Sequence, residues 1–279
     1  MSESVTAFAP GNISGVFKVI PHDDPAHMHS LGLGLTVSEG VRVAVSRAEA
    51  DYSVSFNGEP IDFPTVRSVV EHLTSDPVRV VIESPLPLSC GFGLSGASSL
   101  ATAYSLDALM GHGRSQEELA MVAHVAEVEN LTGLGDVCAQ FHGGCLVKLT
   151  PGEPLGAQRL AVEEQPIYYR YFGPISTRAV LSDAPARERI NRAADTALHS
   201  LDHLSSQEEV DFNACIDVCK SFAVNSDLLR DQAVRDTIEA IEAMGGSASM
   251  IMLGNAVFST RQFEGASQTT LSMGNARLL

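Results

Sequence analysis

Apolar and polar positions alternate with a period of two along the first part of the chain, which is typical of β-strands. Residues 5–20 alternate in this way and predict a strand or a hairpin, and residues 31–49 predict strands interrupted by glycines. Shorter strands are expected at 52–56, 78–83, 145–149, 167–171, 249–253 and 256–260, the last two joined by a turn at Gly254-Asn255. The segment after Arg261 is rich in Ser, Gly and Gln and is weakly specified.

Other segments have the apolar spacing of helices. Helices are predicted at 65–73, 97–110, 115–130, just after 136, and at 183–203, 208–222 and 230–244. Strands early, helices in the middle and a late hairpin predict an α+β fold rather than a regular βαβ alternation. The TPGEPLG stretch at 150–156 is the best internal boundary, which divides the chain into 1–150 and 151–279.

Charge excludes several partner classes. The 279 residues include 18 Lys and Arg against 34 Asp and Glu, a net charge of −16. Nucleic acids and anionic membranes are held by basic patches, so neither is expected as a partner. The only lysines are Lys18, Lys148 and Lys220.

The rest of the composition indicates a cytoplasmic protein. No apolar run approaches the roughly 18 residues of a membrane span, and the N-terminus lacks the basic and apolar regions of a signal peptide. Five cysteines without such a signal predict reduced thiols. Cys215 and Cys219 share a helix face, where two small core side chains are the better interpretation than a metal site.

A glycine-rich loop precedes the second predicted helix. Gly91, Gly93 and Gly96 formally match a dinucleotide fingerprint, but two prolines separate them from the preceding strand, and no acidic residue ends a strand about 20 residues on. The lysine of a P-loop is also missing. A glycine loop at a helix N-terminus offers free N–H groups and a positive dipole end, so we expect it to hold phosphate without cationic side chains.

Carboxylates follow this loop in the sequence. Glu127 and Glu129 close the next predicted helix, and Asp136 lies in a glycine turn between apolar segments. Phosphoryl transfer uses a divalent cation on oxygen ligands and often a base beside the attacking hydroxyl. The alternatives to a functional role are structural. The glutamates could be exposed surface charges, and Asp136 could cap a helix.

Four segments together resemble the GHMP kinases. AFAPGNISGVF (7–17) is similar to the first family motif and SPLPLSCGFGLSGASSL (84–100) to the second, which wraps the phosphates of ATP. AHVAEVENLTGLGDV (123–137) resembles the Glu-then-Asp segment, and GGSASMIMLGNAVFS (245–259) lies where the third motif belongs. The details point further, to the archaeal pantoate kinases.

The resemblance implies an α+β, two-lobed GHMP kinase fold with the active site in the cleft. It implies Mg²⁺- and ATP-dependent phosphorylation of pantoate to 4-phosphopantoate in coenzyme A biosynthesis. A kinase for homoserine or mevalonate, and an inactive ligand sensor, are the alternatives. GHMP kinases are often dimers, so the resemblance is compatible with a homodimer.

Matched by motif, Asp136 falls on the catalytic base, and Ser95 and Glu127 fall on the Mg²⁺ ligands, with Glu129 as the alternative glutamate. The phosphate-binding set is Gly91, Phe92, Gly93, Leu94, Ser95, Gly96 and Ala97. Two positions depart from the mevalonate kinase pattern. Asn12 replaces the motif-one lysine, and motif three retains only Gly254 near its turn.

The substrate side is less specified. A carboxylate needs a cation or donors, and Lys18, Arg42 and Arg178 are the candidates. The HDDPAHMH segment (22–29) reads as a loop rather than a metal cluster, and its first residues are candidates for hydroxyl contacts. The predicted substrate-binding residues are Asn12, Ser14, Lys18, His22 and Asp23.

Overall fold

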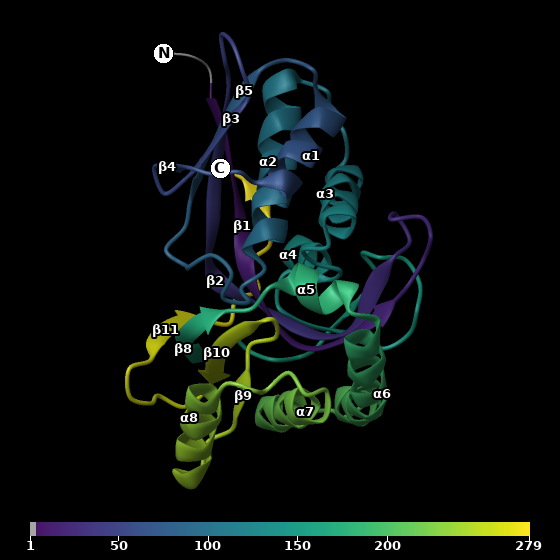
Figure 1. The fold of residues 1–279 in the computed structure, drawn as a ribbon, viewed down its shortest axis with the longest axis vertical. Helices are drawn as coiled ribbons and strands as arrows, with labels where there is room; N and C mark the ends of the chain where they lie inside the picture. The colour runs from purple at the N-terminus through teal and green to yellow at the C-terminus, as the bar shows by residue number, and fades with distance from the viewer. Residues whose placement is uncertain (1–3) are drawn as a thin grey trace.

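The structure, a computed structural model, describes residues 4–279 and contains two β-sheets covered by helices (Figure 1). The path of the first sheet runs in the order β12 (Arg277–Leu278), β1 (Ser4–Ile20), β2 (His29–Arg47), β5 (Val78–Glu83), β3 (Ser53–Phe56) and β4 (Glu59–Pro60). Off this path, β6 (Cys145–Lys148) pairs with β2, and β7 (Gln158–Arg159) pairs with β6. The second sheet runs in the order β11 (Ser267–Thr270), β8 (Pro166–Pro174), β10 (Gly254–Ser259) and β9 (Ala248–Met250).

The helices form two groups along the chain, and α6 (Ala184–Ser205) of the second group still packs on β1 and β2 of the first sheet. The first group is α1 (Pro64–Leu73), α2 (Leu94–Met110), α3 (Gln116–Asn130) and α4 (Asp136–His142). The second group is α5 (Thr177–Ser182), α6 (Ala184–Ser205), α7 (Phe212–Asn225) and α8 (Gln232–Ala243), in the lower half of Figure 1. The predicted α+β class is therefore confirmed. No helix in residues 4–279 is long and apolar enough to cross a membrane.

Helix α2 is the centre of the first half. It packs on β1 and β2 and is flanked by α1 and α3. Nearly all of its residues are buried, and small side chains such as Gly96 and Ala97 allow this close packing. The helix begins at Leu94 rather than at the predicted Ala97, and Gly111 ends it with φ +70°. Its N-terminus is therefore held rigidly at the edge of the core.

Strands β1 and β2 form one long antiparallel pair that reaches into both halves of the molecule. Their register shifts twice, between Pro10 and Asn12 and between Ser14 and Val16. Such irregularities bend a strand and re-aim its side chains. At the second shift, a Cβ on Gly15 would overlap the Cys219 sulfur, so the glycine is what lets α7 pack against β1.

Several predicted boundaries were wrong. The predicted interruptions within 31–49 do not break the strand, because β2 is paired along almost its whole length. The turn of the late hairpin lies at Met252-Leu253, where Leu253 has φ +61°, and Gly254 begins β10 instead. The seventh helix starts after its cap, Asp211. The short helix α5 and the two strands after Arg261 carried too little periodicity to be predicted.

The five cysteines are free and buried, which fits the core interpretation of Cys215 and Cys219. No group of three or more His, Cys, Asp or Glu suited to a metal ion occurs among the described residues. Residues 22–28 form a loop in which the Asp24 carboxylate accepts a hydrogen bond from the Ala26 N–H, and His29 begins β2.

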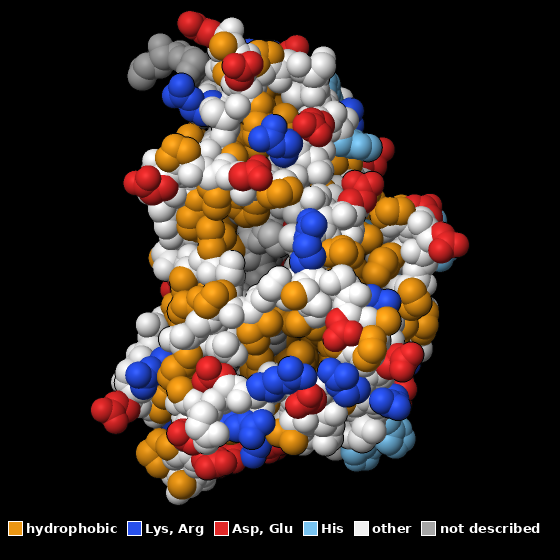
Figure 2. Space-filling view, in the orientation of Figure 1, with side chains coloured by type: hydrophobic (Ala, Val, Ile, Leu, Met, Phe, Trp, Pro, Cys, Tyr) orange, Lys and Arg blue, Asp and Glu red, His pale blue; other side chains and the backbone are white. Residues whose placement is uncertain are grey.

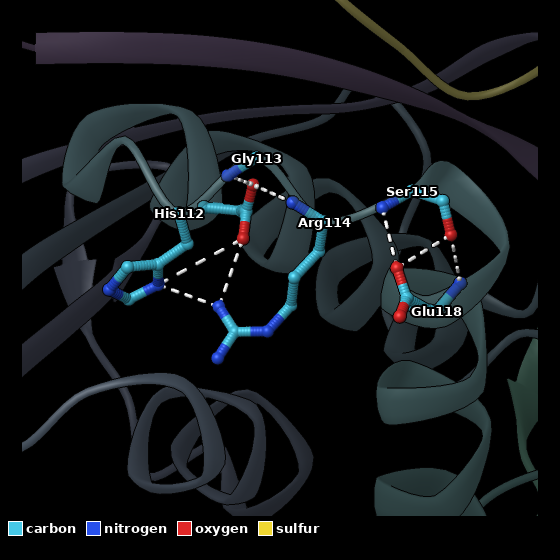
Figure 3. Close-up of polar contacts among 6 residues, drawn as sticks. His112, Gly113, Arg114, Ser115 and Glu118 are labelled. Atoms are coloured by element: carbon cyan, nitrogen blue, oxygen red, sulfur yellow. Dashed lines mark hydrogen bonds and ion pairs between the residues drawn. The ribbon is translucent and has the colours of Figure 1, made fainter.

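Polar contacts fix the connection between α2 and α3 (Figure 3). The buried Asp107 carboxylate accepts hydrogen bonds from the backbone nitrogens of Gly113 and Arg114, at 3.1 and 3.2 Å, and from Arg114 Nη1 at 3.0 Å. Ser115 and Glu118 then form the predicted capping box, with each side chain bonded to the other residue's N–H. Asp107 therefore determines where α3 begins.

We expect Asp107→Ala to lower the free energy of unfolding by about 2–3 kcal/mol, because two backbone donors and the Arg114 guanidinium lose their carboxylate acceptor. Urea denaturation measures this change. Ser115→Ala is the control, because an exposed cap is worth about 1 kcal/mol. Equal losses in the two variants would contradict a special role for the buried carboxylate.

Candidate active site

A cavity of about 430 Å³ lies between the two halves of the molecule, and Figure 2 shows the hollow on one face. Its walls come from β1 and β2, the N-terminus of α1, the glycine loop before α2, the segment before α4, α5, and the β9–β10 turn. The cavity thus joins segments that are far apart in the sequence, including all four motif regions.

The glycine loop has a conformation that its glycines make possible. Gly91 has φ +87° and Gly93, the residue before α2, has φ +57°. The Phe92 carbonyl accepts a hydrogen bond from the Asn12 backbone N–H at 2.9 Å, and the Gly93 carbonyl accepts one from Gln140 Nε2 at 2.8 Å. Because both carbonyls accept hydrogen bonds from other parts of the protein, the loop's conformation is set without a ligand.

The third motif meets this loop directly. A Cβ on Gly254 would overlap the backbone of Cys90 and Gly91, so only glycine allows β10 to pack against the glycine loop. Gly254, the one residue retained from motif three, therefore has a structural function.

The predicted phosphate-binding set separates into backbone and side-chain contributors. Phe92 and Leu94 are buried, and the Phe92 ring packs edge-on against Tyr169, so these residues can offer only backbone atoms. Helix α2 has no side-chain cap at its N-terminus and no acidic residue in its first turn. Its free N–H groups and positive dipole end border the cavity, which is the expected environment for a phosphate.

Ser95 and Glu127 meet beside this helix terminus. Ser95 Oγ donates to Glu127 Oε2 at 2.9 Å. Glu127 is 1% exposed, and its second oxygen, Oε1, is buried without a partner among the described residues. A hydroxyl and a carboxylate with an unused oxygen are the ligands that Mg²⁺ prefers, so these residues fit the ion. Glu129 is exposed and lies outside this arrangement.

Asp136, the first residue of α4, lies near Glu127. Gly135 occupies the capping position, so the alternative interpretation of Asp136 as a helix cap is wrong. Asp136 Oδ1 accepts hydrogen bonds from Asn12 Nδ2 at 2.7 Å and from Ser14 Oγ at 3.3 Å. The two register shifts in β1 flank these donors. Asn12 thus contacts the carboxylate from the motif-one position, with an amide in place of a charge.

Desolvation raises the pKa of both carboxylates. Desolvation, with repulsion from the Asp136 carboxylate, raises the pKa of Glu127 to about 8. Desolvation also raises the pKa of Asp136, while the Asn12 and Ser14 hydrogen bonds act in the opposite direction. Neither carboxylate forms an ion pair with a side chain of residues 4–279. A divalent cation would lower both pKa values because it stabilises the ionised forms.

Two glycines allow the carboxylates to approach the loop. A Cβ on Gly93 would lie 2.9 Å from Asp136 Oδ1. A Cβ on Gly133 would lie 2.6 Å from Glu127 Oε2 and 2.9 Å from Asp136 Oδ2. The TGLGD segment therefore needs its first glycine for space around both acids.

The other predicted substrate residues are not all brought to the cavity. Asn12 and Ser14 line it, whereas Lys18, His22 and Asp23 do not. Lys18 instead pairs with Asp195 on α6. Arg178 lines the cavity, but Arg42 does not.

Sequence reasoning missed Gln140 and Lys148 as members of this site. Lys148 lies on β6, directly across from Gly32 of β2, and both line the cavity. The scarcity of lysines drew attention to Lys148, but nothing in its neighbours indicated which strand it would face. Gln140 lies one turn into α4 after Asp136, and this helical spacing was the available signal.

The comparisons with known proteins agree with this geometry. The family model for the GHMP kinases N terminal domain matches residues 64–144. A pantoate kinase of Methanospirillum hungatei is 34% identical over 263 residues, covering 91% of this chain and 86% of that protein. A pantoate kinase of Methanocaldococcus jannaschii is 30% identical over 258 residues, covering 90% of each chain.

Solved structures show the same fold. A phosphotransferase related to the CoA biosynthesis pathway has a TM-score of 0.85 and 26% identity, covering 99% of this chain and 98% of its own. A homoserine kinase of Cytophaga hutchinsonii has a TM-score of 0.71 and 16% identity, covering 100% of this chain and 98% of its own. The fold, the glycine loop and the paired carboxylates define a small-molecule kinase of the GHMP type. Within that superfamily, the chain belongs to the pantoate kinase family.

We expect Gly133→Ala to lower kcat/KM by about 100-fold, because its methyl group would displace Glu127 and Asp136 and small misplacements of catalytic groups are costly. Steady-state kinetics and a thermal melt test this together. Gly152→Ala is the matched control, since a Cβ there meets nothing within 4 Å. Equal turnover in the two variants would show that the space around Gly133 is unimportant.

We also expect the free energy of unfolding to fall with rising pH in the absence of Mg²⁺. The folded protein raises the pKa of Glu127 from 4.5 to about 8, so between these values it binds more protons than the unfolded chain. The stabilising protonated form is lost as the pH rises through the folded-state pKa.

Thermal melts from pH 5 to pH 9 test this expectation. Glu127→Gln should flatten the slope, because glutamine does not titrate, and Glu129→Gln on the exposed position should leave it unchanged. An identical slope in wild type and Glu127→Gln would contradict the raised pKa.

Proposed function

We propose that this protein transfers the γ-phosphoryl group of ATP to the primary hydroxyl of pantoate, giving 4-phosphopantoate in coenzyme A biosynthesis. The observation that carries the proposal is Asp136, a carboxylate beside the α2 N-terminus whose Oδ1 is held by two donors. The curated relatives over most of the chain are pantoate kinases, which supports the choice of substrate.

Each group has a proposed function in the reaction. The backbone of residues 91–97 holds the phosphates of ATP at the helix N-terminus. Ser95 and Glu127 hold Mg²⁺, which offsets phosphate charge when bound. Asp136 accepts the hydroxyl proton as the substrate oxygen bonds to the γ-phosphorus and the bond to the β-phosphate oxygen breaks. Asn12 and Ser14 orient Asp136 for this step.

The substrate carboxylate is proposed to bind Lys148. Only Lys148 and Arg178 are cationic among the described residues of the cavity wall. Lys148 Nζ donates to the carbonyls of Glu153 and Pro154, which holds it in place on β6. A fixed ammonium at the cavity wall suits a small carboxylate, so we favour Lys148 over the candidates predicted from the sequence.

The division of labour along the chain is also a proposal. Residues 1–150 supply the nucleotide loop and both carboxylates, and residues 151–279 complete the cavity through α5 and the β9–β10 turn. We further propose a cytoplasmic enzyme, consistent with five free buried thiols. A homodimer is the assembly suggested by the resemblance to other GHMP kinases.

The assay that tests the function is pantoate-dependent release of ADP with Mg²⁺. Homoserine and mevalonate are the comparison substrates, and turnover of either at or above that of pantoate would overturn the pantoate assignment. Binding of ATP and pantoate without release of ADP would instead favour an inactive sensor.

We expect Asp136→Asn to lower kcat by about 10²–10⁴-fold with little change in ATP affinity, because the amide is nearly isosteric but cannot accept the proton. Kinetics and nucleotide titration measure the two effects separately. Near-normal turnover would remove Asp136 as the base.

A further inference from the structure

One cationic side chain of the cavity wall remains without a function. Arg178 lies on the short helix α5, at the side of the cavity formed by the second half of the chain. Its side chain is exposed, and Nη2 donates to the Asn130 carbonyl at 2.9 Å. A guanidinium has five N–H donors, so most of its hydrogen-bonding capacity is unused in this state.

Helix α5 is lightly attached to the rest of the protein. Its one buried side chain is Leu181, its main packing partner is α6, and Arg187 on α6 donates to the Leu181 carbonyl. The Arg178 bond to Asn130 is the hydrogen bond that ties α5 to the first half. Segments with few buried contacts are those that move when a ligand binds.

The site needs a cation on the phosphate side. Glu127 is buried and Asp136 is half-buried at the cavity wall, and the polyphosphate adds several negative charges that one divalent ion offsets only in part. At motif one, Asn12 contacts Asp136 with a neutral amide. Lys148 lies across from Gly32, and its Nζ is held by two backbone carbonyls, so it is not free to move.

The Asn130 carbonyl that accepts the Arg178 hydrogen bond lies near the proposed phosphate-binding groups. Asn130 ends α3 in the same turn as Glu127, whose carbonyl accepts the Thr132 N–H at 3.1 Å. Glu127 in turn bonds Ser95 at the start of α2. A guanidinium released from Asn130 therefore begins beside the turn that carries the proposed metal ligand.

We propose that Arg178 exchanges the Asn130 carbonyl for oxygens of the phosphoryl group in transfer, and there supplies the positive charge that Asn12 lacks. This inference deepens the proposed kinase function and rests on it. Arg178 donates hydrogen bonds and no proton. The substrate oxygen bonds to the γ-phosphorus, the bond to the β-phosphate oxygen breaks, and the proton goes to Asp136. The planar guanidinium suits this contact because it binds two phosphate oxygens at once.

The test compares Arg178→Gln and Arg178→Lys with wild type, using kcat, the KM for each substrate, and binding of Mg·ATP without an acceptor. We expect Arg178→Gln to lower kcat by about 10³-fold, because an arginine at a transferring phosphoryl group is worth 10³–10⁵-fold. The KM for pantoate should change by less than about threefold, because the interaction forms mainly in the transition state. Arg178→Lys should recover about tenfold of the loss, since charge remains but the fork is gone.

Arg47→Gln is the matched control, because it removes one positive charge at an exposed pair with Asp76 away from the cavity. Free guanidinium ion added to Arg178→Ala should restore part of the turnover, which a loss of folding would not allow. A raised KM for pantoate with normal kcat would overturn the proposal in favour of carboxylate binding. Wild-type kinetics in Arg178→Gln, or equal losses in Arg47→Gln, would overturn it as well.

These outcomes are separate from failure of the pantoate assignment. If wild type prefers another alcohol, the same variants are measured with that alcohol. The function as proposed then fails, while the expected loss of kcat in Arg178→Gln still tests Arg178.

Discussion

The proposed active site depends on the desolvation of two neighbouring carboxylates. Desolvation disfavours the charged forms of Glu127 and Asp136, and repulsion from Asp136 further raises the pKa of Glu127. Neither has an ion pair among the described residues, so neutral donors support them: Ser95 for one, Asn12 and Ser14 for the other. An isolated charge in such a place would be very costly. The site is therefore suited to gain a cation, which would stabilise the ionised forms of both carboxylates.

The fold positions these groups by means of backbone features. The two register shifts in β1 bracket Asn12 and Ser14, and the buried α2 presents its N-terminus to the cavity. Glycines at 93 and 133 leave room for the carboxylates, so the acids, the loop and the donors approach more closely than side chains with a Cβ would allow. A lysine-poor chain can in this way bind a polyanion with N–H groups, a metal ion and very few cationic side chains.

The sequence predicted most of the elements and the centre of the site, for identifiable reasons. The capping box at Ser115, the β-branched strand 78–83 and the glycine loop are local patterns, and local patterns determine local structure. The late turn was misplaced because Gly254 reads locally as a turn residue, whereas its absent side chain serves contact with the distant Cys90. Packing between segments remote in sequence also determines two features of the site. It buries Glu127 rather than Glu129, and it places Lys148 at the cavity wall.

The contact of Gly254 with the glycine loop also bears on how the protein is made. The loop at residues 91–96 leaves the ribosome long before β10 is synthesised, and β12, which pairs with β1 at Ala7 and Phe8, follows β10. Contacts of such large sequence separation form late, because the intervening chain must be ordered first. The surroundings of the glycine loop are therefore completed only after β10 has been translated, and a polypeptide that stops before β10 exposes the loop without this contact.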